Sequence, residues 1–241
     1  MTEKSEILIV FSTELEAESL LNKLNGKRII LSDGNKFKLI NSNVDILISG
    51  IGIPATTYSL TKKVISKKYD LIINAGICGT FNEDLSVGEC VSVISDEFAD
   101  IGISYPDASF NTLFEEYLLK PNTYPFSNGE LYNPLKSNID TELPKVTAIT
   151  VNTVSGNTEQ INFRKEKFNS DIETMEGAAC AFVCLKEKIN FLQIRAVSNI
   201  IEERNKAHWN IPLALKNLGD ELFDILNKIT IKEQETLIVK D

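Results

Sequence analysis

Short apolar runs alternate with longer amphipathic stretches along this chain. Nearly continuous apolar runs are typical of strands covered on both faces, and they occur at residues 6–11, 45–49, 70–74, 87–94, 145–151 and 190–197. Helices are predicted between these runs, at residues 14–24, 55–67, 176–188 and 208–228. The alternation predicts an α/β protein of three layers, α/β/α, with a central, mostly parallel (mixed) sheet.

Two stretches depart from this alternation. Residues 28–31 and 36–40 flank the turn sequence Ser32-Asp33-Gly34-Asn35 and predict a hairpin. The segment from about Asp100 to Asn138 is rich in Pro, Asn and Ser and contains several aromatic residues. Loops of this length are uncommon in compact domains, so we expect the segment to be functional or interfacial.

The bulk composition is that of an ordinary globular protein. The chain has 241 residues, of which 43% are hydrophobic and 24% charged. No linker divides it, so residues 1–229 are predicted to form one domain, with residues 230–241 as a short C-terminal tail. No apolar run is long enough to span a membrane. The polar, acidic start lacks the features of a secretory signal, which predicts a cytoplasmic protein.

Charge and metal-ligand content exclude several classes of function. The net charge is −9, which disfavours nucleic acids and anionic membranes as partners. The four cysteines are expected to be reduced, and Cys180 and Cys184 should share one face of a helix that points into the core. Metal binding would require further ligands, and His208 is the only histidine. We therefore expect neither a metal nor a cofactor.

Three predicted strands end in candidate ligand loops, namely Ser12-Thr13-Glu14, Gly50-Ile51-Gly52 and Gly76-Ile77-Cys78-Gly79. In open α/β sheets, ligands bind where strands end, and glycines allow a backbone to approach them closely. Tight strand-to-helix turns would explain the same glycines. The chain contains no Gly-Lys-Ser/Thr phosphate loop, and Gly50-Ile51-Gly52 lacks the third glycine of a dinucleotide site.

Five segments, in this order, resemble the nucleoside phosphorylase and nucleosidase family. They are Phe11-Ser12-Thr13-Glu14-Leu15-Glu16-Ala17, Ser49-Gly50-Ile51-Gly52, Asn74-Ala75-Gly76-Ile77-Cys78-Gly79, Thr174-Met175-Glu176-Gly177-Ala178-Ala179 and Ile194-Arg195-Ala196-Val197-Ser198-Asn199. Val154-Ser155-Gly156 and the run from Ser198 to Trp209 look like the futalosine hydrolase branch, which serves a route to menaquinone. The resemblance implies a nucleoside phosphorylase-like fold, a small-molecule nucleoside substrate and a homodimer.

The resemblance also implies roles for individual residues. Glu16 matches the glutamate that activates water, although a capping-box glutamate at the third position of a helix is the alternative. Glu176 matches the residue that holds the ribose hydroxyls, and Met175 packs against the sugar. Gly76 and Ile77 belong to the loop that faces the substrate. Ile77 replaces a polar residue of phosphate-binding relatives, and no Arg occurs between Arg28 and Arg164. Water is therefore the expected acceptor.

Asn199 bears on the choice of base. Adenine-specific relatives have an aspartate here that protonates the base, which an amide cannot do. An amide can instead donate a hydrogen bond to a 6-oxopurine. We therefore expect hydrolysis of futalosine with release of hypoxanthine. The alternatives are an inosine or guanosine phosphorylase or nucleosidase, and a non-catalytic nucleoside-binding protein, which would not need both Glu16 and Glu176.

Some assignments stay open at this stage. Arg204 and Trp209 could cover the side chain of futalosine, or form an ion pair at a helix start and a core anchor. The aromatic that stacks on the base is unassigned, with Phe163 as a candidate. The sequence at residues 157–161 is read as a loop, and the contribution of Thr174 is undetermined.

Overall fold

The computed structural model describes residues 4–24, 36–38, 42–107, 109–133, 141–203 and 205–238. One mixed sheet runs through it in the order β10-β9-β5-β11-β4-β1-β3-β2, and β8 pairs with β5. The strands are β1 (Ser5–Phe11), β2 (Lys36–Lys38), β3 (Ser42–Ile48), β4 (Leu71–Thr80), β5 (Cys90–Phe98), β8 (Leu131–Tyr132), β9 (Lys145–Thr150), β10 (Ile172–Thr174) and β11 (Asn190–Ile200). Of the expected hairpin, only residues 36–38 are described, and they pair with β3; the rest lies outside the described residues.

Parallel pairing dominates the centre of the sheet, as expected. Strands β3, β1, β4 and β11 are mutually parallel, whereas β11 runs antiparallel to β5. The short strand β10 pairs with β9 and also with β4. Strands β4, β11, β5, β9 and β10 therefore form a closed ring, and closure removes two exposed sheet edges.

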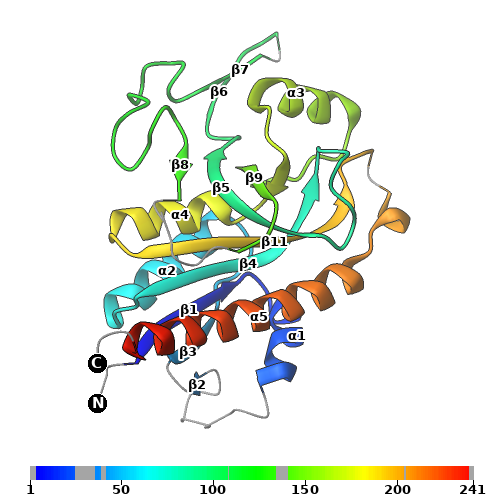
Figure 1. Cartoon of the computed structure of the whole chain (residues 1–241). Coiled ribbons are helices and arrows are strands. Elements are labelled where there is room, and N and C mark those ends of the chain that lie inside the picture. Colours follow the sequence, from blue (N-terminus) through cyan, green and yellow to red (C-terminus); the bar gives the residue numbers. More distant parts are fainter. Residues whose placement is uncertain are drawn as a thin grey trace.

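Helices cover both faces of the sheet (Figure 1), which confirms the three-layer α/β/α prediction. Helices α1 (Glu14–Leu24) and α5 (Ile211–Ile238) pack on one face, and α2 (Ile53–Ser66) and α4 (Gly177–Lys186) pack together on the other. The apolar run of β1 is continuous because both faces of this strand are buried. Ile7, Ile9 and Phe11 contribute to the core under α1 and α5, while Leu8 and Val10 contribute to the core under α2 and α4.

Several elements differ from the expectations. The stretch read as a loop at residues 157–161 begins a helix, α3 (Thr158–Phe168), whose N-cap Asn157 accepts a hydrogen bond from the Gln160 amide at 2.9 Å. Of its residues only Arg164 is buried, so hydrophobic periodicity could not reveal it. Helix α5 ends at Ile238 instead of Lys228, because no Gly or Pro follows Ile229 to stop it. The expected tail is therefore helical up to Ile238.

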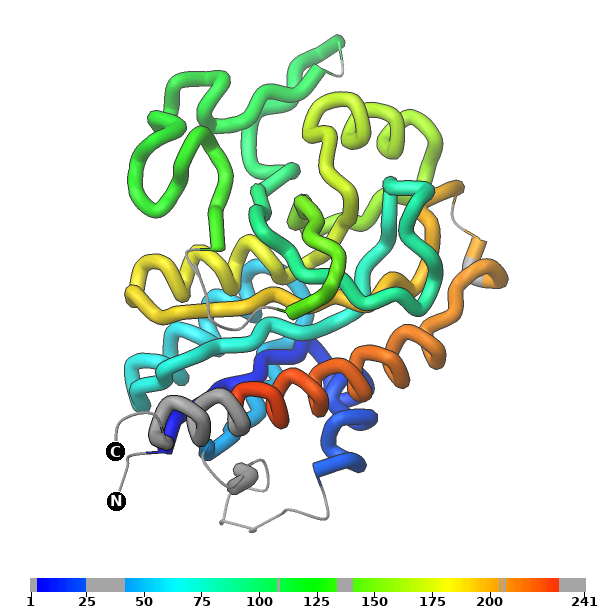
Figure 2. The backbone as a smooth tube through the Cα atoms, viewed as in Figure 1, coloured from blue at the N-terminus to red at the C-terminus, as the bar shows by residue number. Residues whose placement is uncertain are grey.

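The segment after residue 100 lies apart from the main sheet (Figure 2). It contains a two-stranded sheet of β6 (Gly102–Ser104) and β7 (Phe110–Thr112). Aromatic edge contacts attach it to the core, because Phe126 packs against Phe98 and Phe182. Its proposed functional or interfacial role stays a prediction, and residues 134–140 are outside the described part.

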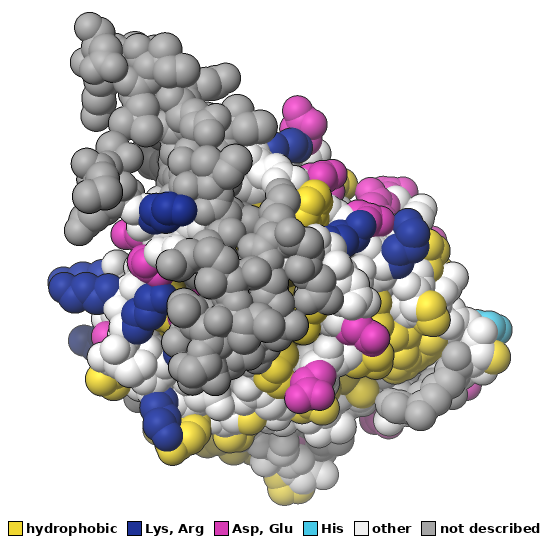
Figure 3. Space-filling model, turned by 90° about the horizontal axis from the view of Figure 1, so that it is seen from below, with side chains coloured by type: hydrophobic (Ala, Val, Ile, Leu, Met, Phe, Trp, Pro, Cys, Tyr) yellow, Lys and Arg dark blue, Asp and Glu magenta, His cyan; other side chains and the backbone are white. Residues whose placement is uncertain are grey.

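Two surface properties bear on partners. Among the described residues, none of the helices combines the length and apolar character that a bilayer crossing requires. On the face seen in Figure 3, acidic side chains stand among the basic ones. The expected absence of a nucleic-acid partner stays a prediction.

Asp96 is a buried carboxylate inside the ring of strands. Its side chain accepts hydrogen bonds from Gln193 Nε2 at 2.9 Å and from Thr150 Oγ1 at 2.8 Å. Burial raises the pKa of Asp96 to about 6, although both hydrogen bonds and the charge of Arg195 oppose that shift. Asp96 consequently binds its proton more tightly in the folded protein than in the unfolded chain.

This difference predicts a pH-dependent effect of Asp96→Asn. The folded-state pKa is the higher one, so the stability that protonation provides is present below the unfolded pKa and is lost as pH rises through about 6. Asn cannot ionise. The unfolding free energy of the variant, relative to the natural protein, should therefore increase between about pH 4 and about pH 7, by up to about 3 kcal/mol. Urea unfolding at both pH values measures it, and a constant difference would contradict the assignment.

Candidate active site

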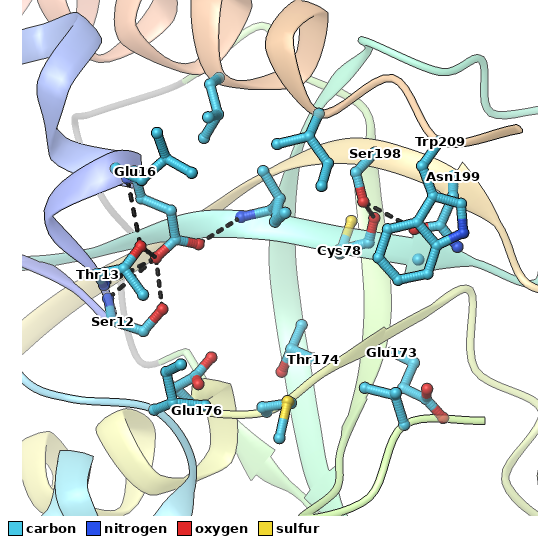
Figure 4. A pocket seen from close by; sticks show the side chains of 18 of the residues that line it. Ser12, Thr13, Glu16, Cys78, Glu173, Thr174, Glu176, Ser198, Asn199 and Trp209 are labelled. Carbon is cyan, nitrogen blue, oxygen red and sulfur yellow. Dashed lines mark hydrogen bonds between the residues drawn. The ribbon is translucent and has the colours of Figure 1, made fainter. Parts of the chain in front are cut away.

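A cavity of about 390 Å³ lies at the ends of β1, β4, β10 and β11 (Figure 4). This volume falls in the range of small-molecule sites, roughly 300–1,000 Å³. Its described lining residues are Ser12, Thr13, Leu15, Glu16, Ile51, Ile77, Cys78, Gly79, Val154, Ser155, Glu173, Thr174, Met175, Glu176, Ser198, Asn199, Ile201, Trp209, Ile211 and Leu215. Segments that are far apart in the sequence therefore meet in one space.

Most of the predicted site residues are brought together here. Glu16, Ile77, Met175, Glu176 and Asn199 all line the cavity. Figure 4 shows Glu16 and Glu176 toward one end and Asn199 toward the other. Gly76 is adjacent, because a Cβ at that position would lie 2.7 Å from the carboxylate of Glu16. Arg204 lies outside the described residues.

The aromatic candidates are separated by the structure. Phe163 is absent from the described lining and instead makes edge contacts with Phe110 and Phe168, at centroid distances of 6.2 and 6.4 Å. The suggestion that Phe163 stacks on the base is therefore wrong. Trp209 lines the cavity and lies beside Asn199 in Figure 4. It is thus a wall of the cavity and not a core anchor.

Glu16 closes a helix cap and also lines the cavity. Its Oε2 accepts hydrogen bonds from the Ser12 and Thr13 amides at 3.2 and 3.1 Å, and the Glu16 amide donates to Thr13 Oγ1 at 3.3 Å. This reciprocal pattern is a capping box for α1. Meanwhile Oε1 accepts from the Ile77 amide at 3.1 Å. The cap holds one oxygen and directs the other toward the cavity.

The glycine motif at residues 76–79 does not form the expected loop. It lies within β4, which continues to Thr80 because β11 and β10 flank it on either side. The absence of a side chain at Gly76 is needed here. A Cβ would lie 2.7 Å from both Glu16 Oε1 and Arg195 Nη1. Only glycine therefore lets the carboxylate and the guanidinium both lie this close to the β4 backbone.

Arg195 is a functional candidate that sequence reasoning missed. It is 2% exposed on β11, and its Nη2 donates to Asn74 Oδ1. Among the described residues, its Nε has no hydrogen-bond partner. A buried cation without a close carboxylate is costly unless it serves a ligand or balances several charges nearby. The signal was available, because a charged Arg stands directly between the apolar residues Ile194 and Ala196 of this strand.

Glu176 lies on the opposite wall from Glu16. The Gly52 amide donates to its Oε1 at 2.9 Å, and the left-handed backbone of Gly52 (φ 86°) presents that amide. Burial raises the pKa of Glu176, and the nearby charge of Arg195 opposes that effect. The second carboxylate oxygen remains available to accept hydrogen bonds from a ligand.

Asn199 owes its position to an irregularity in β11. The register between β11 and β4 shifts between Val197 and Asn199, so that Asn199 pairs with Gly79. Such bulges re-aim side chains. The Ser198 hydroxyl lies 2.8 Å from Asn199 Oδ1, and Asn199 Nδ2 donates to the Ile200 carbonyl at 3.0 Å. The amide is thereby oriented, and its second N–H remains for a ligand.

A buried ion pair supports the wall near Asn199. Glu173 lines the cavity and accepts hydrogen bonds from the amide and hydroxyl of Ser155, both at 2.7 Å. Arg164 Nη1 reaches the same carboxylate at 2.8 Å, and both partners are about 5% exposed or less. Helix α3, which the sequence analysis missed, therefore anchors the Ser155 loop through Arg164.

Within the described ranges, no group of three or more His, Cys, Asp or Glu side chains is arranged to hold a metal ion. Cys180 and Cys184 are buried on α4 with their sulfurs 4.0 Å apart, which confirms that they share a core face.

Known proteins are similar to this chain in sequence. The sequence model of the phosphorylase superfamily matches residues 6–229. The chain is similar to a futalosine hydrolase from Acidothermus cellulolyticus, with 26% identity over 88% of this chain and 86% of that protein. It is also similar to a 5′-methylthioadenosine/S-adenosylhomocysteine nucleosidase from Haemophilus ducreyi, with 25% identity over 94% of this chain and 100% of that protein.

Solved structures share the fold. The structure of futalosine hydrolase from Helicobacter pylori strain 26695 superposes with a TM-score of 0.76 at 18% identity, covering 93% of this chain and 98% of that one. The nucleosidase of the same organism, in complex with butyl-thio-DADMe-Immucillin-A, gives the same TM-score at 17% identity, covering 94% of this chain and 100% of that one. Similarity at this level of identity describes the architecture alone.

Proposed function

Since the chain belongs to the phosphorylase superfamily, we propose that its cavity hydrolyses the N-glycosidic bond of futalosine and releases hypoxanthine. One observation carries this proposal. A carboxylate suited to water (Glu16), a carboxylate suited to ribose hydroxyls (Glu176) and an amide suited to a 6-oxopurine (Asn199) line one cavity. Their separation toward two ends matches the sugar and base of a nucleoside.

Glu16 activates the water in this mechanism. Cleavage of the glycosidic bond leaves positive charge on the ribosyl ring, and water attacks that centre as a carboxylate removes its proton. We assign the proton removal to Glu16 Oε1, which lies at the cavity wall where the Gly76 backbone leaves space for it beside Arg195 Nη1. The fixed hydrogen bonds to Oε2 keep Oε1 in place, so no reorganisation is needed during the reaction.

Glu176 holds the ribose. Its Oε1 is already bound by the Gly52 amide, so Oε2 accepts from the 2′ and 3′ hydroxyls. Met175, also in the lining, packs against the sugar. These contacts fix the reacting carbon relative to the water, which provides part of the rate acceleration.

Asn199 and Trp209 recognise the base. The free N–H of the Asn199 amide donates to the N7 or O6 side of the purine, where negative charge develops as the base departs. Trp209 stacks on the ring from the adjacent wall. Arg204 is proposed to meet the carboxylate of the futalosine side chain on the basis of sequence alone.

Water is the proposed acceptor because of the charges around the cavity. Phosphate binding requires cationic or multiple N–H donors. No Lys or Arg occurs among the described lining residues. Ile77 presents an apolar side chain where a polar one would serve phosphate, and its amide is bound to Glu16.

The choice of futalosine over other nucleosides depends mainly on Asn199. The relatives include futalosine hydrolases at 26–28% identity and methylthioadenosine nucleosidases at 23–25% identity, so overall similarity does not separate them. An amide at position 199 favours hypoxanthine over adenine. An inosine or guanosine hydrolase is the second candidate. A futalosine hydrolase would act in the cytoplasm, on the futalosine route to menaquinone.

Release of free base tests the proposal directly. Futalosine, inosine and methylthioadenosine are incubated with the protein, with and without phosphate, and the released base is separated by chromatography. We expect hypoxanthine from futalosine at the same rate in both conditions, because water is the acceptor. Strict dependence on phosphate would overturn the hydrolase assignment, and faster turnover of inosine would favour the second candidate.

The variant Glu16→Gln tests the role of Glu16 in the same assay. It preserves the side-chain volume and removes the proton acceptor, so turnover should fall by at least about a hundredfold. Futalosine binding, measured by calorimetry, should persist. A retained rate would show that Glu16 is only a helix cap.

Base preference tests the role of Asn199. Asn199→Asp introduces a group that can protonate N7 of adenine, so the ratio of kcat/KM for methylthioadenosine to that for futalosine should rise by about tenfold or more. Asn217→Asp is a matched control, since the Asn217 amide donates to the Gly88 carbonyl outside the described lining. An unchanged ratio in Asn199→Asp would remove this residue from base recognition.

The homodimer that the resemblance implies is proposed to form through the outer face of α2. Tyr58 and Ile65 on α2 are 68% and 73% exposed, Ile51 just before the helix is 61% exposed, and large exposed apolar side chains mark interfaces. Light scattering should give twice the chain mass of 26.9 kDa. Tyr58→Glu should yield monomers, whereas Tyr117→Glu, at a 93% exposed site on the segment after residue 100, should not. A monomeric natural protein would refute the dimer.

A further inference from the structure

We propose that Asp96 is a positioning residue for the ribose-binding carboxylate: through the Thr150 hydroxyl it holds the N-terminus of α4 and so fixes Glu176. The inference deepens the proposed function, since it rests on Glu176 binding ribose. Asp96 is 2% exposed and absent from the described cavity lining. It therefore acts through other residues and not on the substrate.

The capping of α4 is the first observation. Glu176 is the N-cap residue of α4, yet its side chain makes no capping hydrogen bond. Helices need such bonds for their first amides, and the N-cap side chain usually supplies one. Here the Gly177 amide donates to Thr174 Oγ1 at 3.3 Å and the Ala178 amide donates to Thr150 Oγ1 at 2.7 Å. Hydroxyls at the ends of β10 and β9 thus replace the cap, and Glu176 is free to face the cavity.

The hydrogen bonds of this group all point toward Asp96, which is the final acceptor. The Thr150 hydroxyl has one hydrogen, which it donates to Asp96 Oδ1 at 2.8 Å. Its lone pairs therefore accept from the Ala178 amide and from the Thr174 hydroxyl, 3.1 Å away. Asp96 Oδ2 accepts from Gln193 Nε2 at 2.9 Å. A carboxylate that accepts at both oxygens orients the Thr150 hydroxyl as an acceptor for the helix.

Close packing makes this arrangement rigid. A Cβ at residue 177 would lie 2.1 Å from Asp96 Oδ2 and 2.2 Å from Gln193 Nε2. The Asp96 carboxylate and its partner therefore rest directly against the backbone of the residue after Glu176, and only glycine fits there. A negative charge at this end of α4 also complements the helix dipole.

The test uses nucleoside binding in a Glu16→Gln background, where slow turnover lets futalosine binding be measured by calorimetry. Thr150→Val keeps the side-chain shape and removes the hydroxyl. We expect it to weaken futalosine binding by about tenfold, as for loss of a hydrogen bond to a charged group, and to leave binding of free hypoxanthine, which has no ribose, unchanged. Thr150→Ser should restore futalosine binding.

A double-mutant cycle separates positioning from a general structural effect. With Gln at position 176, the further change Thr150→Val should alter futalosine binding by less than about twofold, because the group that Thr150 positions is already lost. Asp96→Asn should reproduce the ribose-specific loss in part. The matched control is Asp45→Asn. It neutralises another buried carboxylate, which lies on β3 and accepts hydrogen bonds from Lys67 and Tyr69. It should leave both affinities unchanged.

The outcomes distinguish this inference from the proposed function. Equal losses for futalosine and hypoxanthine, or the same loss with Gln at position 176, would overturn the positioning role while the natural protein still releases hypoxanthine. If the natural protein cleaves inosine instead, the same cycle with inosine applies. If no nucleoside binds, the ribose role of Glu176 and this inference both fail. Retained hypoxanthine binding shows that each variant is folded.

Discussion

The parallel pairing of β11 with β4 determines where the groups of the cavity stand. Over most of its length this pairing is regular, and it places Arg195 opposite Gly76 and Gln193 opposite Asn74. One register shift then places Asn199 opposite Gly79. Because Glu16 binds the amide of Ile77 on β4, the same two strands set the distance between the carboxylate and the amide of the site. A change of register by one residue would turn each of these side chains to the other face.

Helix capping is the second principle of the site, and it is used in two ways. In α1 the cap and the proposed base are the same residue, since one oxygen of Glu16 closes the capping box and the other faces the cavity. In α4 the cap is supplied by Thr150 and Thr174, which leaves the N-cap residue Glu176 for a ligand. The capping role of Glu16 therefore leaves one of its oxygens for the role proposed for it, and the two interpretations do not exclude each other.

Sequence reasoning succeeded where patterns are local. The strand at β1, the helices α1 and α4 and the three-layer arrangement follow from apolar runs and caps, and the shared face of Cys180 and Cys184 follows from helical spacing. It failed where the environment overrides local preference. Residues 76–79 read as a glycine loop, but pairing on both sides draws them into β4. Helix α3 has no fully buried apolar side chain; Ile161 and Phe168 pack only partly against the core, and Asn157 and the Arg164–Glu173 pair add polar contacts.

By itself, the sequence determined the fold class and named the residues at the strand ends, because hydrophobic period and capping chemistry act within a few residues of the chain. The resemblance of its motifs to a known family also named Glu16, Glu176 and Asn199 as a set. Only the tertiary structure decided that Arg195 and Glu16 both lie against Gly76, that Trp209 and not Phe163 forms a cavity wall, and that Asp96 lies against Gly177. Arg195 stands 119 positions after Gly76 and 179 positions after Glu16 in the sequence. Strand pairing brings these residues together, and no local pattern encodes that pairing.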